Sequence, residues 1–256
     1  MGGSWRYPAA AIVVVLLVWH FGVMLFEVPK YLVPTPLAVA ERLWEDRIFM
    51  LSHSGVTLMT TLGGFVMSVA VGIPLGMLLV WSQMLERSIM PLLVVSQSFP
   101  KVAIAPLIVI WFGLGLFPKI LIAFSVAFFP IVIATIAGMK SVDDDLKDLA
   151  RSMQATPLKT FTKIRLPFAL PQIFSGVKVA VAFATVGAVV GEWVGADAGL
   201  GYLLLWSNAN LDTPLLFAVL VCLMVIGLAL YYAVEFLEAW ALPWHVSVRG
   251  DNLQLT

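Results

Sequence analysis

Six windows of mostly apolar residues follow one another along this chain. A helix needs about 20 apolar residues to cross the roughly 30 Å hydrocarbon core of a membrane. Such windows occur at approximately 8–26, 56–80, 89–112, 119–138, 170–193 and 214–238. In the whole chain 61% of the residues are hydrophobic and 12% are charged, whereas a soluble domain has about 25% charged residues. We therefore expect an all-α integral membrane protein with about six transmembrane helices.

The third window is the least regular of the six. Pro100 and Pro106 interrupt it, and Lys101 places a charge near its middle. Proline is tolerated in membrane helices when neighbouring groups satisfy the freed backbone. The window is therefore predicted to be one span with a kink.

The distribution of Lys and Arg predicts the orientation. One side of the predicted membrane carries Arg6, Arg87, Lys140, Lys147, Arg151, Lys159, Lys163, Arg165 and Arg249, and the other carries Lys30, Arg42, Arg47 and Lys119. The side richer in these residues is normally cytoplasmic. An even number of spans then places both termini in the cytoplasm.

Two connections between the windows are long. Residues 27–55 contain a Pro-rich segment leading into a short amphipathic helix, which we expect at the outer membrane surface. Residues 139–169 carry the densest charge and predict two short helices joined by a turn near Gln154. Ser141 is expected to cap the first helix and Thr156 the second, which has Pro157 at its first position.

The first of these short helices is predicted to be amphipathic. An apolar stripe recurs at helical spacing through Leu146, Leu149, Ala150 and Met153. The opposite face carries the charged residues Asp144, Lys147, Asp148 and Arg151. Considered alone, such a helix could equally pack beneath its own bundle or dock a partner.

The spacing in this loop resembles a known motif. Asp148-Leu149-Ala150, then Gln154, Ile164 and Leu166-Pro167, follow the register of the EAA loop, E-A-A-x3-G-x9-I-x-L-P, of binding-protein-dependent ABC importer permeases. Asp148 stands in the position of the Glu, Leu149 in that of the first Ala, and Gln154 in that of the Gly. The resemblance implies that this loop, including the stripe from Leu146 to Met153, couples the chain to an ATPase, with Ala150 making the closest approach.

Further segments extend the resemblance over nearly the whole chain. They are PLLVVSQSFPKVAIAPLIVIWFGLG, FFPIVIATIAGMKSVD, LPFALPQIFSGVKVAVAFATVGAVVGEW and GLGYLLLWSNANLDTPLLFA. Their order is similar to that in the nitrate, sulfonate, taurine and bicarbonate group of permeases, which includes thiamine-precursor pyrimidine and riboflavin permeases.

This resemblance implies a type I ABC importer permease in the bacterial cytoplasmic membrane. Such a permease acts as a homodimer within membrane lipid, with a cytoplasmic ATPase dimer that holds ATP and Mg and an extracellular or periplasmic solute-binding protein. It would move a small solute by alternating access. The implied organisation is a first helix with an external segment (1–55), a core permease domain (56–240) with its coupling loop (139–169), and a cytoplasmic tail (241–256).

The chain is not expected to be an enzyme. It has no G-x-x-x-x-G-K-[ST] phosphate loop, so ATP hydrolysis is expected on a separate subunit. His20, His53 and His245 are widely spaced, and the lone Cys222 lies in an apolar run. We therefore expect no catalytic residue, no metal site and no cofactor in this chain, and no nucleic acid as a partner.

Charged residues inside spans are candidate functional residues because their burial in lipid is costly. Lys101 is a candidate for the translocation path, with a structural or gating role as an equal alternative. Glu192 is a candidate for an outer gate or for docking of the binding protein, with simple interfacial solvation as an alternative. Lys178 is expected to reach the nearby membrane surface with its long side chain.

Two other classes of transporter are alternatives. An ion-coupled secondary transporter commonly has internal repeats and carboxylates within its spans, and the chain has neither a clear repeat nor an acidic residue in the centre of a predicted span. An ABC exporter usually carries a fused ATPase domain, whose signature is absent. The importer permease is therefore the preferred hypothesis.

Overall fold

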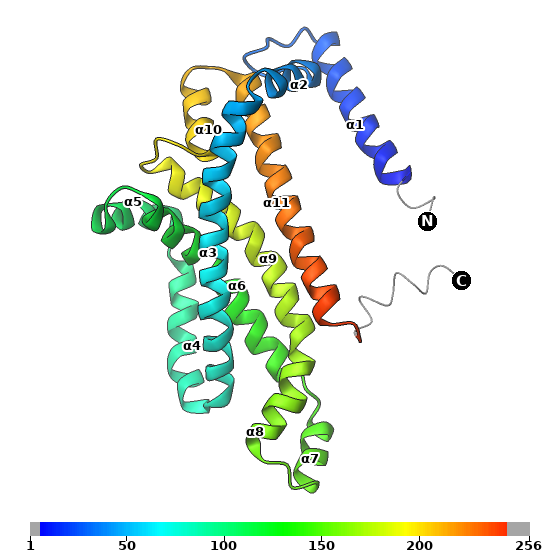
Figure 1. Cartoon of the computed structure of the whole chain (residues 1–256), viewed down its shortest axis with the longest axis vertical. Coiled ribbons are helices and arrows are strands. Elements are labelled where there is room, and N and C mark those ends of the chain that lie inside the picture. The colour runs from blue at the N-terminus through cyan, green and yellow to red at the C-terminus, as the bar shows by residue number, and fades with distance from the viewer. Residues whose placement is uncertain (1–5, 245–256) are drawn as a thin grey trace.

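The helices run nearly the full length of the chain. A computed structural model describes residues 6–244, and these residues form helices joined by short turns with no strand. Five helical segments are long and apolar enough to cross a membrane: α1 (Arg6–Leu25), α3 (Arg47–Trp81), α6 (Leu116–Lys140), the continuous segment Pro157–Trp193, and α11 (Thr213–Ala241). Figure 1 shows α3, α6, α9 and α11 side by side along the long axis of the molecule.

The third predicted window is two helices and not one kinked span. α4 (Gln83–Ser98) and α5 (Lys101–Phe112) meet at 96°. Phe99 has an extended backbone with ψ 127°, the conformation imposed on a residue that precedes proline, and Pro100 has no N–H to continue the helix. If this bent pair counts as one span, the structure has the six spans that the sequence predicts.

The core of the bundle is formed by α3, α6 and α9 (Leu166–Trp193), which pack closely through small residues. Gly64 of α3 lies directly against Ala123 of α6, and a Cβ at Gly187 of α9 would come within 2.7 Å of the Ala123 backbone. Gly176 of α9 packs in the same way against Ala134 of α6. Small residues allow membrane helices to approach closely where burial of apolar surface provides little attraction between helices. Gly64, Gly176 and Gly187 therefore serve the close packing of these three helices.

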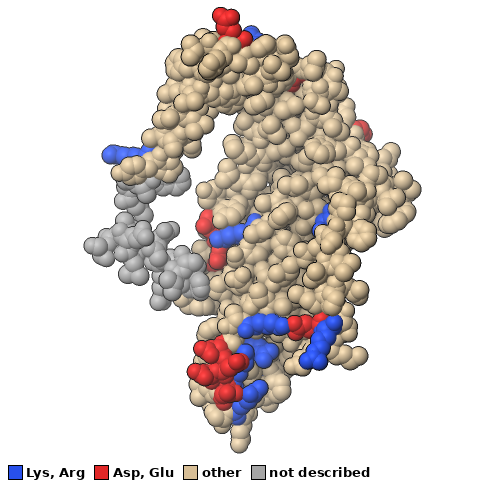
Figure 2. Space-filling model, turned by 180° about the vertical axis from the view of Figure 1, so that it is seen from behind, with Lys and Arg blue, Asp and Glu red and all other residues tan. Residues whose placement is uncertain are grey.

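Short helices close the two ends of the bundle. α2 (Pro36–Glu45) and α10 (Leu200–Ala209) lie at one end, and α7 (Asp144–Ser152) and α8 (Pro157–Thr160) project from the other (Figure 1). The predicted helix in the first long connection is confirmed, since the Thr35 side chain caps α2 and Pro36 opens it. Figure 2 shows acidic and basic side chains gathered at the end formed by α7 and α8, whereas most of the surface between the two ends carries no charge.

The first helix lies at the periphery of the bundle. Most α1 side chains are exposed, and Val23 is its one buried residue. Trp19 of α1 contacts Phe217 of α11, with ring centroids 5.6 Å apart. The predicted boundary at residues 55 and 56 falls inside the continuous helix α3, and residues 245–256 of the predicted tail lie outside the described residues.

Candidate functional site

The segment between α6 and α9 forms a helical hairpin. α7 is its first arm; α8, a single π-helical turn η1 (Phe161–Arg165) and the start of α9 form the second. Thr156 caps α8 by accepting a hydrogen bond from the Lys159 N–H, as predicted. The prediction that Ser141 caps α7 is wrong. Asp143 is the cap, accepting from the Asp145 N–H, while the Ser141 hydroxyl donates to the Gly138 carbonyl at 2.8 Å.

Gln154 makes the turn between the two arms. Its φ is +53°, in the left-handed region that favours glycine. The Ala155 N–H donates to the Ala150 carbonyl and the Gln154 N–H to the Arg151 carbonyl, each at 2.9 Å. These two bonds form a Schellman motif, the usual end of a helix with a left-handed residue. The turn therefore keeps the geometry expected of a glycine although glutamine occupies the position.

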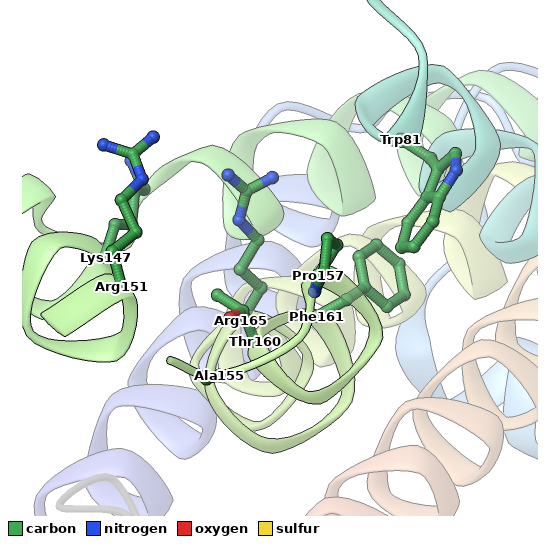
Figure 3. A pocket seen from close by; sticks show the side chains of 8 residues that line it. All are labelled: Trp81, Lys147, Arg151, Ala155, Pro157, Thr160, Phe161 and Arg165. Carbon is green, nitrogen blue, oxygen red and sulfur yellow. The ribbon is translucent and has the colours of Figure 1, made fainter. Parts of the chain in front are cut away.

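A pocket of about 280 Å³ lies between this hairpin and the end of α3 (Figure 3). It is lined by Trp81, Lys147, Arg151, Ala155, Pro157, Thr160, Phe161 and Arg165. The Trp81 and Phe161 rings meet edge to face with centroids 5.2 Å apart. Three of the eight lining side chains are cationic, and none is acidic.

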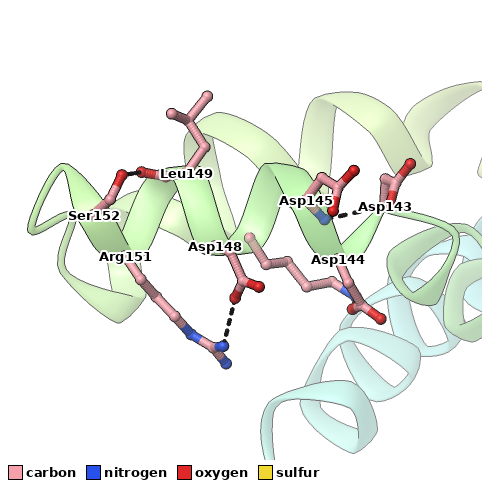
Figure 4. Close-up of polar contacts among 8 residues, drawn as sticks. Asp143, Asp144, Asp145, Asp148, Leu149, Arg151 and Ser152 are labelled. Carbon is pink, nitrogen blue, oxygen red and sulfur yellow. Dashed lines mark hydrogen bonds and ion pairs between the residues drawn. The ribbon is translucent and has the colours of Figure 1, made fainter.

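The charged face of α7 is held by ion pairs along the helix. Lys147 Nζ donates to Asp144 and Arg151 Nη1 to Asp148, each at 2.8 Å (Figure 4). The Lys147 ammonium, through this hydrogen bond and its charge, holds the pKa of the Asp144 carboxyl below its ordinary value. Leu149 points to the opposite side of α7 from Asp148 and Arg151 in Figure 4. The predicted amphipathic character of this helix is confirmed.

The apolar stripe does not form one exposed surface. Leu149 is 56% and Met153 74% exposed, whereas Ala150 is 3% exposed and Leu146 is half-buried. Ala150 therefore packs within the chain, contrary to the expectation that it makes the closest approach to a partner. The exposed members of the stripe are Leu149 and Met153.

The last three residues of the motif lie where the hairpin joins the bundle. Ile164 is in the π-helical turn, Leu166 is the first residue of α9, and Pro167 occupies the first turn of that helix. Leu166 packs against the core cluster that includes Ala169 and Ile173. These residues connect the hairpin rigidly to α9, because the helix is continuous from Pro157 to Trp193.

Lys101 begins α5, at the break between the two halves of the bent pair. Its ammonium lies 4.7 Å from the centroid of the Phe129 ring of α6. A cation over an aromatic face is stabilised by the electrons of the ring. Lys101 is partly exposed at the level of the break.

Glu192 is buried at the end of the bundle opposite the hairpin. Only 1% of the residue is exposed, so simple interfacial solvation does not describe it. Its Oε2 accepts hydrogen bonds from the Thr57 hydroxyl at 3.0 Å and from the Gly201 N–H at 2.7 Å. Among the described residues its Oε1 has no hydrogen-bond partner. The carboxylate therefore joins α3, α9 and α10.

Two residues that sequence reasoning did not select complete this arrangement. The Leu200 N–H donates to Thr57 Oγ1 at 2.8 Å, and the Gly199 N–H donates to His53 Nδ1 at 3.0 Å. With Gly201, these are backbone donors at the start of α10, which that helix cannot itself satisfy. His53 and Thr57 are four residues apart, so their spacing on one face of α3 was the available signal.

Lys178 of α9 is paired with acidic residues of α11. Its Nζ lies 2.6 Å from Glu238 and 3.8 Å from Glu235, and 5.7 Å from the centroid of the Tyr231 ring. The Lys178 and Glu238 side chains are 18% and 10% exposed. Lys178 therefore forms a link between two spans and does not simply extend toward the membrane surface.

Similar proteins were found in sequence and in structure. The family model described as "Binding-protein-dependent transport system inner membrane component" matches residues 68–242. The chain is 36% identical to the riboflavin transport system permease protein RibX of Chloroflexus aurantiacus, over 94% of this chain and 92% of that protein. It is 34% identical to the formylaminopyrimidine transport permease protein ThiX of Halalkalibacterium halodurans, over 93% of this chain and 95% of that protein.

A solved structure of the MetNI methionine ABC transporter in an inward-facing conformation has a similar fold. The TM-score is 0.64 at 22% sequence identity, with 78% of this chain and 97% of that chain covered. This likeness concerns the fold, and it agrees with the bundle described above. From the family match and the sequence identities, the chain belongs to the binding-protein-dependent transport system inner membrane components and is an ABC importer permease.

Proposed function

We propose that this chain forms the solute path of an ATP-driven importer and receives its energy through the α7–α8 hairpin. ATP and Mg would be bound by a separate pair of ATPase subunits. The observation that carries this proposal is the hairpin itself, which projects beyond the bundle and exposes Leu149 and Met153. Burial of a Leu or Met side chain contributes about 1.5 to 3 kcal/mol, so two such residues can anchor a helix in a partner's cleft.

The hairpin would lie in the cytoplasm, with both termini on the same side. The charge distribution supports this orientation, because Lys147, Arg151, Lys159, Lys163 and Arg165 all belong to the hairpin. α2 and α10 would then face the outside, where a solute-binding protein would dock. Glu192 would fix the position of α10 at this outer end.

A second copy of the chain would complete the path. α4 has no buried residue, and α5 buries only Ala105. These helices therefore present large faces that neither α3 nor α6 covers, and a homodimer within the lipid would enclose a path between them. Lys101, at the break between α4 and α5, would then lie beside the moving solute.

The solute would be small and of the kinds handled by the resembling permeases. A pyrimidine or riboflavin-like vitamin precursor agrees with the identities to ThiX and RibX. A sulfonate, taurine or nitrate-like anion is the second candidate, favoured by the position of Lys101 near the break. Binding of both solute classes to the cognate binding protein would separate these candidates.

The hairpin proposal is tested by co-purification of the ATPase and by solute-stimulated ATP hydrolysis in vesicles. Met153→Asp should reduce both strongly, because it places a charge on the proposed contact surface. Met24→Asp is the control, since Met24 is 59% exposed and lies in the last turn of α1, at the end of the molecule opposite the hairpin. A substitution at Ala150 is not used, because this residue is buried and a charge there would disturb the fold of the hairpin as well as any docking. Wild-type coupling in Met153→Asp, and equally in Leu149→Asp, would contradict the proposal.

A further inference from the structure

The pocket between the hairpin and α3 has a net positive lining. Lys147 and Arg151 are each paired with an aspartate of α7, and these two pairs cancel in charge. Arg165 has no ion pair among the described residues. The pocket therefore carries one net positive charge, that of the Arg165 guanidinium. The paired cations Lys147 and Arg151 line the same pocket.

The Arg165 side chain also lacks a hydrogen-bond partner where it is buried. Its Nε has almost no solvent access, and no acceptor for it lies in the described part of the chain. A buried donor without an acceptor is costly, and more so when it is charged. The guanidinium groups of Arg151 and Arg165 point the same way in Figure 3. An anion with oxygen acceptors would satisfy this donor.

The pocket lies at the level where the spans end. Trp81 is the last residue of α3, and Arg165 immediately precedes α9. Trp81 is 52% exposed and its ring contacts Phe161. Tryptophan is enriched where membrane meets water. An anion bound at this depth would lie beside the exposed Trp81 ring. An anion that also carries an apolar part would contact that ring as well.

We propose that this pocket binds the phosphate of an anionic phospholipid from the leaflet on the hairpin side. Guanidinium groups match phosphate oxygens with paired hydrogen bonds, and basic pockets beside spans bind such headgroups. Arg165 is the principal contact, with Arg151 and Lys147 around it. The proposal rests on the hairpin side being cytoplasmic, since anionic lipid is concentrated in that leaflet.

The test is lipid retention by the purified full-length permease. Protein extracted from vesicles of equal phosphatidylglycerol and phosphatidylcholine would be analysed by native mass spectrometry. Wild type should retain phosphatidylglycerol in preference to phosphatidylcholine. Arg165→Gln should lower this retention about fivefold or more, as expected for loss of one surface cation. Arg165→Lys keeps the charge but not the paired hydrogen bonds, so it should recover only part of it.

Two further variants control for folding and for general charge. Lys163→Gln removes an exposed cation of the same π-helical turn that does not line the pocket, and it should retain lipid like wild type. Arg151→Gln changes a side chain that is 80% exposed, so it tests the pocket even if Arg165→Gln does not fold. It should lower retention two- to fivefold.

Three results would overturn the proposal. The first is wild-type retention in both Arg165→Gln and Arg151→Gln. The second is displacement of the lipid by inorganic phosphate at equal concentration, which would make this a site for free phosphate. The third is a loss of ATPase co-purification in Arg165→Gln or Arg151→Gln while that variant retains lipid like wild type. This result would make the pocket a protein contact. ATPase binding by Met153→Asp is measured separately, so failure of the lipid proposal leaves the coupling proposal intact.

Discussion

Thr57 of α3 donates a hydrogen bond of 3.0 Å to the buried carboxylate of Glu192 in α9, 135 positions later in the chain. The same hydroxyl oxygen accepts the Leu200 N–H of α10 at 2.8 Å. One side chain thus bonds to a buried carboxylate and to a helix terminus at once. Both bonds lie at the end of the bundle opposite the hairpin, so they hold three helices in register there.

The first prediction concerns this contact. Thr57→Val keeps the shape of the side chain but leaves the Leu200 N–H and Glu192 Oε2 each short of one partner. Glu192 Oε2 keeps its bond from the Gly201 N–H, but the Leu200 N–H loses its acceptor. An unsatisfied buried group costs about 1 to 3 kcal/mol, so the melting temperature in detergent should fall. Glu192→Ala should also destabilise, whereas Glu192→Gln, which keeps an acceptor oxygen, should be milder.

Thr185→Val is the control for this experiment. Among residues 6–244 the Thr185 hydroxyl bonds only to the Val181 carbonyl of its own helix, at 3.1 Å, so its loss breaks no hydrogen bond between helices there. A melting temperature for Thr57→Val equal to that of Thr185→Val would show that the contact contributes little to stability.

The second prediction concerns the left-handed turn at Gln154. A non-glycine residue in this conformation costs about 1 to 2 kcal/mol, partly offset in a glycine variant by the greater flexibility of the unfolded chain. Gln154→Gly should therefore slow hydrogen exchange in α7 by up to about fivefold. Gln172→Gly, within α9, should destabilise by about 1 kcal/mol. Faster exchange in α7 of Gln154→Gly would contradict the strain argument.

The long spans and the hairpin could be predicted from the sequence because both depend on local patterns. Apolar length gave the spans, and the spacing of Thr156, Pro157 and the charged residues gave the second arm and the two faces of α7. The cap was misplaced by two residues since Ser141 and Asp143 are both good capping residues. Only the geometry shows which of them faces the free N–H groups.

The remaining features depend on contacts between distant segments. Nothing local indicates that Glu192 meets Thr57, or that Lys178 meets Glu238. The burial of Ala150 likewise depends on how α7 lies against its own chain, which helical periodicity leaves open. The sequence predicted a kink at Phe99 and Pro100, where the structure has a 96° break. A proline indicates that a helix is interrupted but does not indicate the angle of the interruption.

The third prediction concerns acid conditions at α7. The pKa of Asp144 in the folded protein lies below its value in the unfolded chain, because Lys147 stabilises the ionised carboxylate. Its contribution to α7 is therefore present above the unfolded pKa, near pH 4, and is lost as pH falls through the lower, folded value. Carbon-13 NMR of labelled aspartate should show this depressed midpoint.

Lys147→Met should return the Asp144 midpoint to its ordinary value, and Lys159→Met should not, since Lys159 forms no ion pair in the described structure. An unchanged midpoint in Lys147→Met would contradict the assignment of the shift to this lysine.

The fourth prediction concerns the link between α9 and α11. Lys178→Met leaves Glu238 buried without its partner, and breaking a buried pair in this way costs about 3 to 5 kcal/mol. The double variant Lys178→Met with Glu238→Met replaces both charges by apolar groups and should recover much of this loss. Thermal unfolding of the wild type, both single variants and the double variant gives the coupling directly. Additive effects would show that the two side chains do not interact.

The last prediction concerns the side of the membrane that each end of the bundle faces. Ser152 at the end of α7 and Asn210 after α10 are both exposed and lie at opposite ends of the molecule. In a Cys222→Ala background, Ser152→Cys should react with a membrane-impermeant maleimide only in inverted vesicles. Asn210→Cys should react from the outside in cells whose cytoplasmic membrane is intact and whose outer envelope has been made permeable to the reagent. Cys222→Ala alone is the control for background labelling. Labelling of both cysteines from one side would overturn the six-span topology, and labelling with the sides exchanged would place the hairpin outside, where no ATPase could reach it.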